Sequence, residues 1–224
     1  MKKSLFIMWV VSGLTASSVV AANKTFEAEL EDLLTNHKYK QVIGKVNENS
    51  KTIQTPEPYV IQSEAFCIVG KYQDALDAAE KALKLDDEDE DAHCRKADAL
   101  LELDKVQESL VEVNRAIQLN SESGEAFTSR ANVQIELENY TGALEDCAKA
   151  LKLDPNLPDA YAARASAAFE LEQYERATTD CDRALKLDPL CLDALRVKVK
   201  LLEESGNLEL AKEFKRKIKS ISDG

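Results

Sequence analysis

The stretch DCAKALKLDP at residues 146–155 returns as DCDRALKLDP at residues 180–189, thirty-four residues later. Each copy carries apolar residues at helical spacing and ends in Asp-Pro. A proline disfavours helical geometry in the residue before it, so each copy predicts the last turns of a helix and its stop signal. The repetition therefore predicts a repeated structural unit, not a catalytic motif that occurs twice.

The thirty-four-residue period extends over most of the chain. Large residues recur at the fourth position of each unit, as Tyr59, His93, Phe127, Tyr161 and Leu195. Small residues recur at the eighth position, as Ser63, Ala97, Ala131, Ala165 and Val199, and at the twentieth, as Ala75, Ser109, Ala143, Ala177 and Ala211. Two packed antiparallel helices need small residues where their backbones approach most closely and large residues where gaps are filled. We expect aromatic side chains at the fourth and seventeenth positions to fill those gaps.

Five units follow this frame, at residues 56–89, 90–123, 124–157, 158–191 and 192–224. A divergent helix pair is predicted before them, at residues 23–55. The last unit has Lys215 at a core position that earlier units fill with Ala79, Val113, Cys147 and Cys181. A charge is tolerated there only if no further repeat stacks on it, so residues 208–221 are predicted to form a solvent-facing cap.

At these repeated positions the sequence resembles the tetratricopeptide repeat family, over nearly its whole length after residue 22. The resemblance implies an all-α fold, a right-handed superhelical solenoid of about five or six antiparallel helix pairs. Basic-Ala pairs such as Arg130-Ala131 and the Asp-Cys pairs of the opening stretch make it most similar to chaperone-associated members, including luminal co-chaperones of the endoplasmic reticulum that carry a J-domain. No J-domain is expected here, because neither histidine is followed by proline.

The family layout implies that the first helix of each repeat lines a concave groove that binds peptides. Carried onto this chain, the layout gives a candidate peptide-binding set of Asp98, Glu102, Thr128, Asn132, Ile135, Glu136, Ser166, Phe169, Arg196 and Lys200. Of the family's clamp for chaperone C-termini, only Asn132 matches, so we do not expect binding of cytosolic heat-shock chaperone tails.

The charge balance bears on the partner. The chain has 29 basic and 41 acidic residues, a net charge of −12, which disfavours an electrostatic grip on nucleic acid or anionic lipid. The predicted groove is acidic and suits basic or mixed segments of partially folded proteins. An alternative stays open: the acids that recur at the second position, such as Glu125 and Asp159, also stabilise helix N-termini through the macrodipole.

Residues 1–22 have the order of a secretory signal peptide. Lys2 and Lys3 precede an apolar run at 5–11, and small residues lead to a cleavage site after Ala21 or Ala22. The predicted location is the endoplasmic reticulum lumen or the secreted fraction, with the bacterial periplasm as the alternative. Residues 5–22 are also just long enough for an uncleaved membrane anchor, so contact with a membrane is expected only in that form.

The cysteines, the sequons and one acidic run suggest three further features. Cys147 and Cys181 are predicted to be small buried residues, while Cys67 and Cys94 are placed near the groove, where they could pair. Asn23 and Asn139 lie in glycosylation sequons, which matter only in a eukaryotic secretory pathway. The acidic run at 86–91 lacks the glycine of a calcium loop and is interpreted as a connector that caps the next helix.

No arrangement of residues predicts catalysis, a metal site, a cofactor or a small-molecule substrate, since no nucleophile, histidine and acid are brought together by the repeat frame. The sequence therefore predicts an exported, non-enzymatic protein-protein interaction module. We expect a co-chaperone-like holder or adaptor that binds client or partner segments. The alternative is a structural adaptor of a membrane-associated or periplasmic complex.

Overall fold

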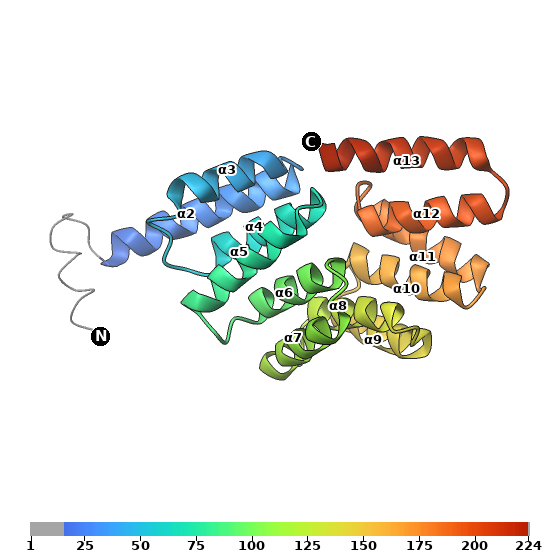
Figure 1. Ribbon diagram of the computed structural model, residues 1–224, viewed down its shortest axis with the longest axis horizontal. Coiled ribbons are helices and arrows are strands. Elements are labelled where there is room, and N and C mark those ends of the chain that lie inside the picture. Colours follow the sequence, from blue (N-terminus) through green and yellow to red (C-terminus); the bar gives the residue numbers. More distant parts are fainter. Residues whose placement is uncertain (1–15, 224) are drawn as a thin grey trace.

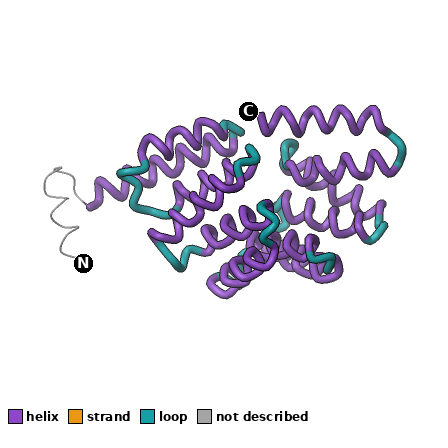
Figure 2. Tube along the Cα trace, in the orientation of Figure 1, coloured by secondary structure: helices purple, strands orange, loops and turns teal. Residues whose placement is uncertain are grey.

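A computed structural model describes residues 16–223, and all regular secondary structure in that range is helical. Short turns join consecutive helices, which stack side by side as antiparallel pairs (Figures 1 and 2). The pairs are α2 (Ala16–Thr35) with α3 (Tyr39–Asn49), α4 (Glu57–Ile68) with α5 (Tyr72–Leu85), α6 (Glu90–Glu102) with α7 (Val106–Leu119), α8 (Gly124–Glu136) with α9 (Tyr140–Leu153), α10 (Pro158–Glu170) with α11 (Tyr174–Leu187), and α12 (Leu192–Glu204) with α13 (Leu208–Asp223). The predicted all-α solenoid of helix pairs is confirmed.

The small residues at the eighth and twentieth positions lie where the two helices of a pair meet. Ala97, Ala131, Ala143 and Ala177 are fully buried there. In two repeats one of the small residues is a serine. The Ser63 hydroxyl donates a hydrogen bond of 2.8 Å to the carbonyl oxygen of Ala75, and the Ser109 hydroxyl donates one of 2.7 Å to that of Ala97. These contacts from one helix to the backbone of its partner require a close approach that larger side chains would prevent.

The aromatic column at the seventeenth position departs from the prediction near the C-terminal end. Tyr72 and Tyr140 are partly buried, but Tyr174 is 38% exposed and Leu208 is 56% exposed. Tyr174 packs edge to face on Phe169, with 5.5 Å between the ring centroids, and so closes no internal gap. The correction has a simple reason: fewer later helices remain to cover this position toward the end of the solenoid.

The aspartate of each opening stretch forms an ion pair within its own repeat. Asp146, with only 4% of its side chain exposed, accepts hydrogen bonds of 2.7 and 2.8 Å from Nε and Nη2 of Arg130. Arg164 and Asp180 repeat this pair at 2.8 and 2.6 Å. The Arg130 guanidinium also lies 5.4 Å from the centroid of the Phe127 ring. Each pair thus joins the first helix of a repeat to the second through a planar, two-bond contact.

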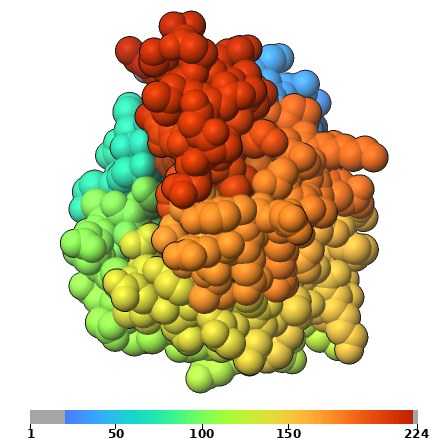
Figure 3. All heavy atoms as spheres, turned by 90° about the vertical axis from the view of Figure 1, so that its right-hand side faces the viewer, coloured from blue at the N-terminus to red at the C-terminus, as the bar shows by residue number. Residues whose placement is uncertain are grey.

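The acidic connector at residues 86–91 caps the helix that follows it. Asp89 in the acidic run accepts a hydrogen bond of 2.7 Å from the Ala92 N–H and so caps α6, which confirms the interpretation of that run as a connector. The predicted cap of the solenoid is also observed, since Lys215 on α13 is 57% exposed and lies 2.6 Å from Glu203. Figure 3 shows α13, in red, at the top of the molecule, above the orange helices of the preceding segments.

The turn between the two helices of a repeat has one backbone conformation throughout. Its central residue has a positive φ of 58° to 77° in Gly70, Asp104, Glu138, Glu172 and Gly206, which are thirty-four residues apart. Glycine adopts this left-handed conformation freely, whereas a residue with a Cβ atom does so at a cost of roughly 1–2 kcal/mol. The three acidic residues therefore carry strain that the two glycines avoid.

Replacing Glu138 by glycine is expected to raise the free energy of unfolding by up to about 1 kcal/mol, because the strain at positive φ is removed. Gly70→Ala is expected to lower it by about 1 kcal/mol. The added Cβ would meet no atom within 4 Å, so crowding does not contribute. Urea denaturation measures both changes, and a stabilised Gly70→Ala variant would contradict this account of the turn.

Candidate functional site

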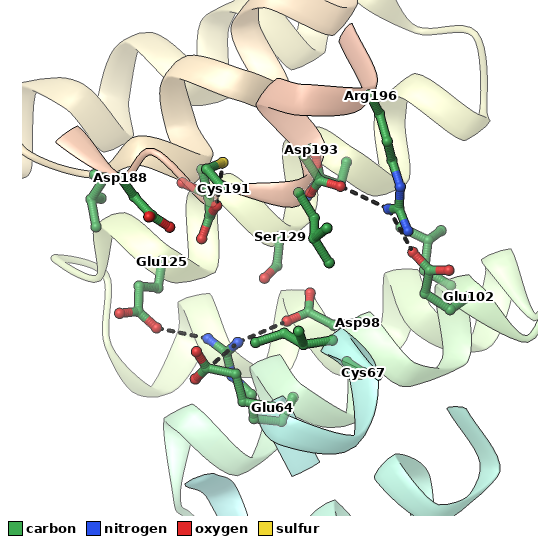
Figure 4. A pocket seen from close by; sticks show the side chains of 18 of the residues that line it. Glu64, Cys67, Asp98, Glu102, Glu125, Ser129, Asp188, Cys191, Asp193 and Arg196 are labelled. Atoms are coloured by element: carbon green, nitrogen blue, oxygen red, sulfur yellow. Dashed lines mark hydrogen bonds and ion pairs between the residues drawn. The ribbon is translucent and has the colours of Figure 1, made fainter. Parts of the chain in front are cut away.

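The concave side of the solenoid contains a cavity of about 280 Å³, which we name the central well. Side chains of α4, α6, α8 and α12 line it, joined by Asp159 of α10, Tyr39 of α3 and the loop at 188–191 (Figure 4). Its charged lining consists of the carboxylates Glu64, Asp98, Glu102, Glu125, Asp159, Asp188 and Asp193 and the guanidiniums Arg95 and Arg196. The well is therefore strongly acidic.

Helical spacing explains how single helices supply several lining residues. Asp98 and Glu102 on α6 are four residues apart, and Thr128 and Asn132 on α8 have the same separation. Residues four apart lie on one face of a helix, so each first helix turns one stripe of side chains toward the well. The opposite face of each helix carries the alanines that contact the second helix of its pair.

The well is enclosed because the solenoid curves until its ends approach each other. Tyr39 from the first helix pair and Asp188 from the loop before the last pair line the same cavity. A single buried apolar cluster contains Leu30 of α2 together with Leu195 of α12 and Ile221 of α13. The groove predicted from the sequence is thus a well closed at one side by contact between the first and last repeats.

Arg95 holds three carboxylates from three successive first helices. Its guanidinium lies 2.8 Å from Glu125 on α8, 3.4 Å from Asp98 on α6 and 3.7 Å from Glu64 on α4. Only 17% of the Arg95 side chain is exposed. Although burial opposes its charge, these carboxylates raise the pKa of Arg95, which stays cationic, whereas burial is the main cause that raises the pKa of Glu64 and Asp98.

A second acidic group lies on the side of the well formed by α10 and α12. The Cys191 thiol donates a hydrogen bond of 3.3 Å to Asp159, whose carboxylate has no ion pair among the described residues. The Asp159 residue is exposed to the open space of the well, and the walls of the well reduce its contact with bulk water. This loss of solvent and then the nearby charge of Asp193 raise the pKa of Asp159 to about 7.

The structure divides the candidate peptide-binding residues into two groups. Asp98, Glu102, Thr128, Asn132 and Arg196 line the central well. Ile135, Glu136, Ser166, Phe169 and Lys200 lie outside it. Ile135, Glu136 and Phe169 lie at the C-terminal ends of α8 and α10. Lys200 pairs with Glu170, the last residue of α10, at 2.9 Å and lies 5.6 Å from the centroid of the Phe169 ring. The role of all ten residues in peptide binding stays a prediction.

Several residues of the well were not selected from the sequence. Glu64 and Arg95 lie on the concave side of α4 and α6, and the repeat frame could have shown this, because Glu64 shares its position with Asp98 and Asn132. Tyr39 and Asp188 could not have been found in this way, since they join the well only through the curvature of the whole solenoid.

The cysteines are all free. Cys147 and Cys181 are buried, as predicted. The proposed pairing of Cys67 with Cys94 is wrong: Cys67 lines the well, but Cys94 is fully buried against Ala116 and Ala126 in the core. Thr128 and Arg196, at the same position of later repeats, do line the well, so the burial of Cys94 depends on its own neighbours in α7 and α8.

The export and glycosylation signals are only partly covered. Residues 1–15 of the predicted signal peptide lie outside the described residues, and the rest belongs to α2. Asn23 lies within α2, and Asn139 is exposed at the start of α9, where its side chain accepts a hydrogen bond from the Gly142 N–H. Glycosylation of either residue stays a prediction. Within residues 16–223, no helix has the length and apolar character needed to cross a bilayer, and that range holds no cluster of three metal-binding side chains.

Comparison with known proteins places the fold. Family models described as tetratricopeptide repeat match residues 69–123, 124–157 and 162–219. The structure is similar to TTC0263, a thermophilic TPR protein of Thermus thermophilus, with a TM-score of 0.67, 17% identity, and coverage of 78% of this chain and 96% of that one. It is also similar to pilF of Pseudomonas aeruginosa, with a TM-score of 0.58, 16% identity, and coverage of 92% and 94%. No curated protein matches the sequence.

The raised pKa of Asp159 predicts how its replacement changes stability with pH. Its pKa is near 7 in the folded chain and about 3.8 when exposed, so folding takes up a proton between these values, and stability from this group falls as pH rises from about 4 to 7. Asp159→Asn removes the penalty and is expected to raise Tm at pH 8 but not at pH 4. Each 1 kcal/mol gained corresponds to about 2–4 °C.

Thermal melts at both pH values measure the effect. Asp87→Asn, at an exposed residue of the acidic connector, is the control and is expected to show no such difference. Equal Tm changes at pH 4 and pH 8 for Asp159→Asn would show that the charge of Asp159 is not the cause.

Proposed function

Because the chain belongs to the tetratricopeptide repeat family, whose solenoids are protein-protein interaction modules, we propose that its central well binds basic segments of partner proteins. The observation that supports this proposal is the charge of the well. Seven carboxylates and two guanidiniums line it, which gives a formal charge of 2 − 7 = −5 when all are ionised. A concave acidic surface raises the local concentration of cations and orients them.

Helix stabilisation explains only some of these acids, because Glu125, Asp159 and Asp193 lie in the first turns of their helices and the others do not. Glu64 lies in the second half of α4, and Asp98 and Glu102 lie in the second half of α6. Acidic residues are favoured in the first turn of a helix and disfavoured in the last, so the macrodipole opposes Glu102 and gives no gain at Glu64 or Asp98. Their placement supports selection for binding.

The size and lining of the well suit side chains rather than a whole small molecule. A volume of about 280 Å³ lies just below the range of roughly 300–1,000 Å³ typical of ligand pockets. Ile68, Leu101, Leu190 and Leu192 add apolar surface among the carboxylates. The ligand that fits is a partner segment in which lysine or arginine alternates with aliphatic residues, so that basic groups reach the acids and aliphatic groups cover the apolar surface.

We propose that this binding serves a co-chaperone-like holder or adaptor in an exported compartment. The order of charged, apolar and small residues in positions 1–22 supports export. The second candidate is a structural adaptor in a membrane-associated or periplasmic complex, and the just-spanning length of residues 5–22 supports that form. The two differ in the fate of the N-terminus.

Fluorescence anisotropy with labelled peptides tests the proposed ligand class. A peptide of about ten residues that alternates basic and aliphatic side chains should bind at least about tenfold tighter than a matched acidic peptide. Binding should weaken between about 0.1 and 1 M salt, as the screening length falls from about 10 to 3 Å. It should be tighter at pH 8 than at pH 6, because Asp159 loses its proton near pH 7.

The double variant Glu64→Gln/Asp159→Asn should reduce binding of the basic peptide. Glu48→Gln/Asp87→Asn changes the net charge equally at exposed residues outside the well and is the matched control. Equal affinity for basic and acidic peptides would contradict the proposal, and so would an equal loss of affinity for the basic peptide in the two double variants.

Intact-mass analysis of the protein isolated from its native membrane and soluble fractions separates the two settings. A holder exported by a cleaved signal is expected to begin at Ala22 or Asn23. A chain that keeps residues 1–22 and sediments with membranes would instead support the anchored adaptor.

A further inference from the structure

Arg196 bridges two helices that line the central well. It belongs to α12, where its Nη1 atom lies 2.9 Å from Asp193, and the same atom lies 3.8 Å from Glu102 on α6 (Figure 4). Between α6 and α12 in the order of first helices come α8 and α10. This side chain thus joins the repeat of α6 and α7 directly to the repeat of α12 and α13, across the concave face that α8 and α10 also line.

The two arginines of the well differ in how firmly they are held. Arg95 is 17% exposed and contacts three carboxylates on three helices, so its removal would leave three like charges facing one another without a cation between them. Arg196 is 46% exposed and its two partners are 38% and 46% exposed. Exposed ion pairs of this kind change an equilibrium by no more than about fivefold. Arg95 is therefore part of the scaffold, whereas Arg196 can leave at little cost.

Glu102 and Asp193, the two carboxylates that contact Arg196, form a binding site for a cation, which we name the Glu102–Asp193 seat. Glu102 is the last residue of α6, and the Tyr72 phenol stands beside it. Burial and then the hydrogen bond to Glu102 raise the pKa of Tyr72, while Arg196 acts in the opposite direction. A guanidinium from the chain itself already occupies this seat, which shows the kind of group that the seat accepts.

We propose that Arg196 is a gate: it occupies the Glu102–Asp193 seat in the free protein and is replaced there by a guanidinium or ammonium group of the ligand. The proposal rests on the proposed function and adds its regulation. The exchange keeps the charge of the seat balanced, and the displaced Arg196 side chain turns into solvent. The first basic residue of a ligand thereby opens the well for the residues that follow it.

The affinity of the basic peptide for gate variants is the first test. Arg196→Ala is expected to bind the peptide about two- to fivefold tighter than wild type, because no internal cation competes for the seat. Lys215→Ala is the matched control: Lys215 on α13 is 57% exposed, pairs with Glu203 at 2.6 Å and does not line the well. An equal gain in both variants would assign the effect to net charge and overturn the gate.

Glu102→Gln is expected to change the affinity for the basic peptide in the opposite direction. It breaks the same bridge but removes half of the seat, so the basic peptide is expected to bind more weakly than to wild type. Tighter binding to Glu102→Gln would show that the seat does not hold the ligand's cation, and would overturn the exchange.

Alkylation of Cys67 tests the gate without any ligand. Cys67 and Cys191 both line the well, but Cys191 is only 3% exposed and the other three cysteines are buried, so alkylation of the Cys67 peptide by neutral iodoacetamide, followed by mass spectrometry, reports access to the well. Arg196→Ala is expected to react several-fold faster than wild type and Lys215→Ala. Loss of a nearby cation alone would slow the reaction, because it disfavours the thiolate. Wild-type rates in Arg196→Ala would overturn the gate.

The two readouts separate the two proposals. Absence of basic-peptide binding in wild type and in every variant would reject the proposed function, whatever the alkylation rate. Binding by wild type together with unchanged affinity and unchanged Cys67 reactivity in Arg196→Ala would reject the gate alone.

Discussion

The close approach of the two helices within each repeat is the constraint on which the rest of this structure depends. It requires small residues at the eighth and twentieth positions, and where these are serines, as at Ser63 and Ser109, the hydroxyl bonds directly to the partner helix's backbone. One larger side chain at such a position would push the helices apart and change how the next pair stacks. Because each repeat contacts mainly its neighbours, the error would propagate along the solenoid.

That contact also fixes which side of each first helix is free. With one face committed to alanine packing, the stripe that carries Asp98 and Glu102 must turn toward the concave side. The protein places carboxylates there, including at helix ends where the macrodipole disfavours them. Arg95 offsets part of the repulsion by holding three of them, and the remaining carboxylates keep the well acidic.

The Asp-Cys pairs have a role within the repeat. The aspartate pairs with an arginine of the same repeat, as in Asp146 with Arg130, and the cysteine fills the core. The likeness to luminal co-chaperones was drawn from these residues. Their geometry explains the likeness by the stability of a helix pair, so it does not identify the partner.

The sequence by itself determined the helix pairs, the small-residue contacts and the caps, because each depends on residues within about one repeat. It also placed five candidate residues in the well, including Asn132 and Arg196, because helical spacing decides which face they share. Only the tertiary structure decided that Tyr39 meets Asp188 and that Arg196 reaches Glu102. These contacts follow from the curvature of the whole solenoid, which is the total of the small rotations between successive repeats. No short stretch of sequence determines that total.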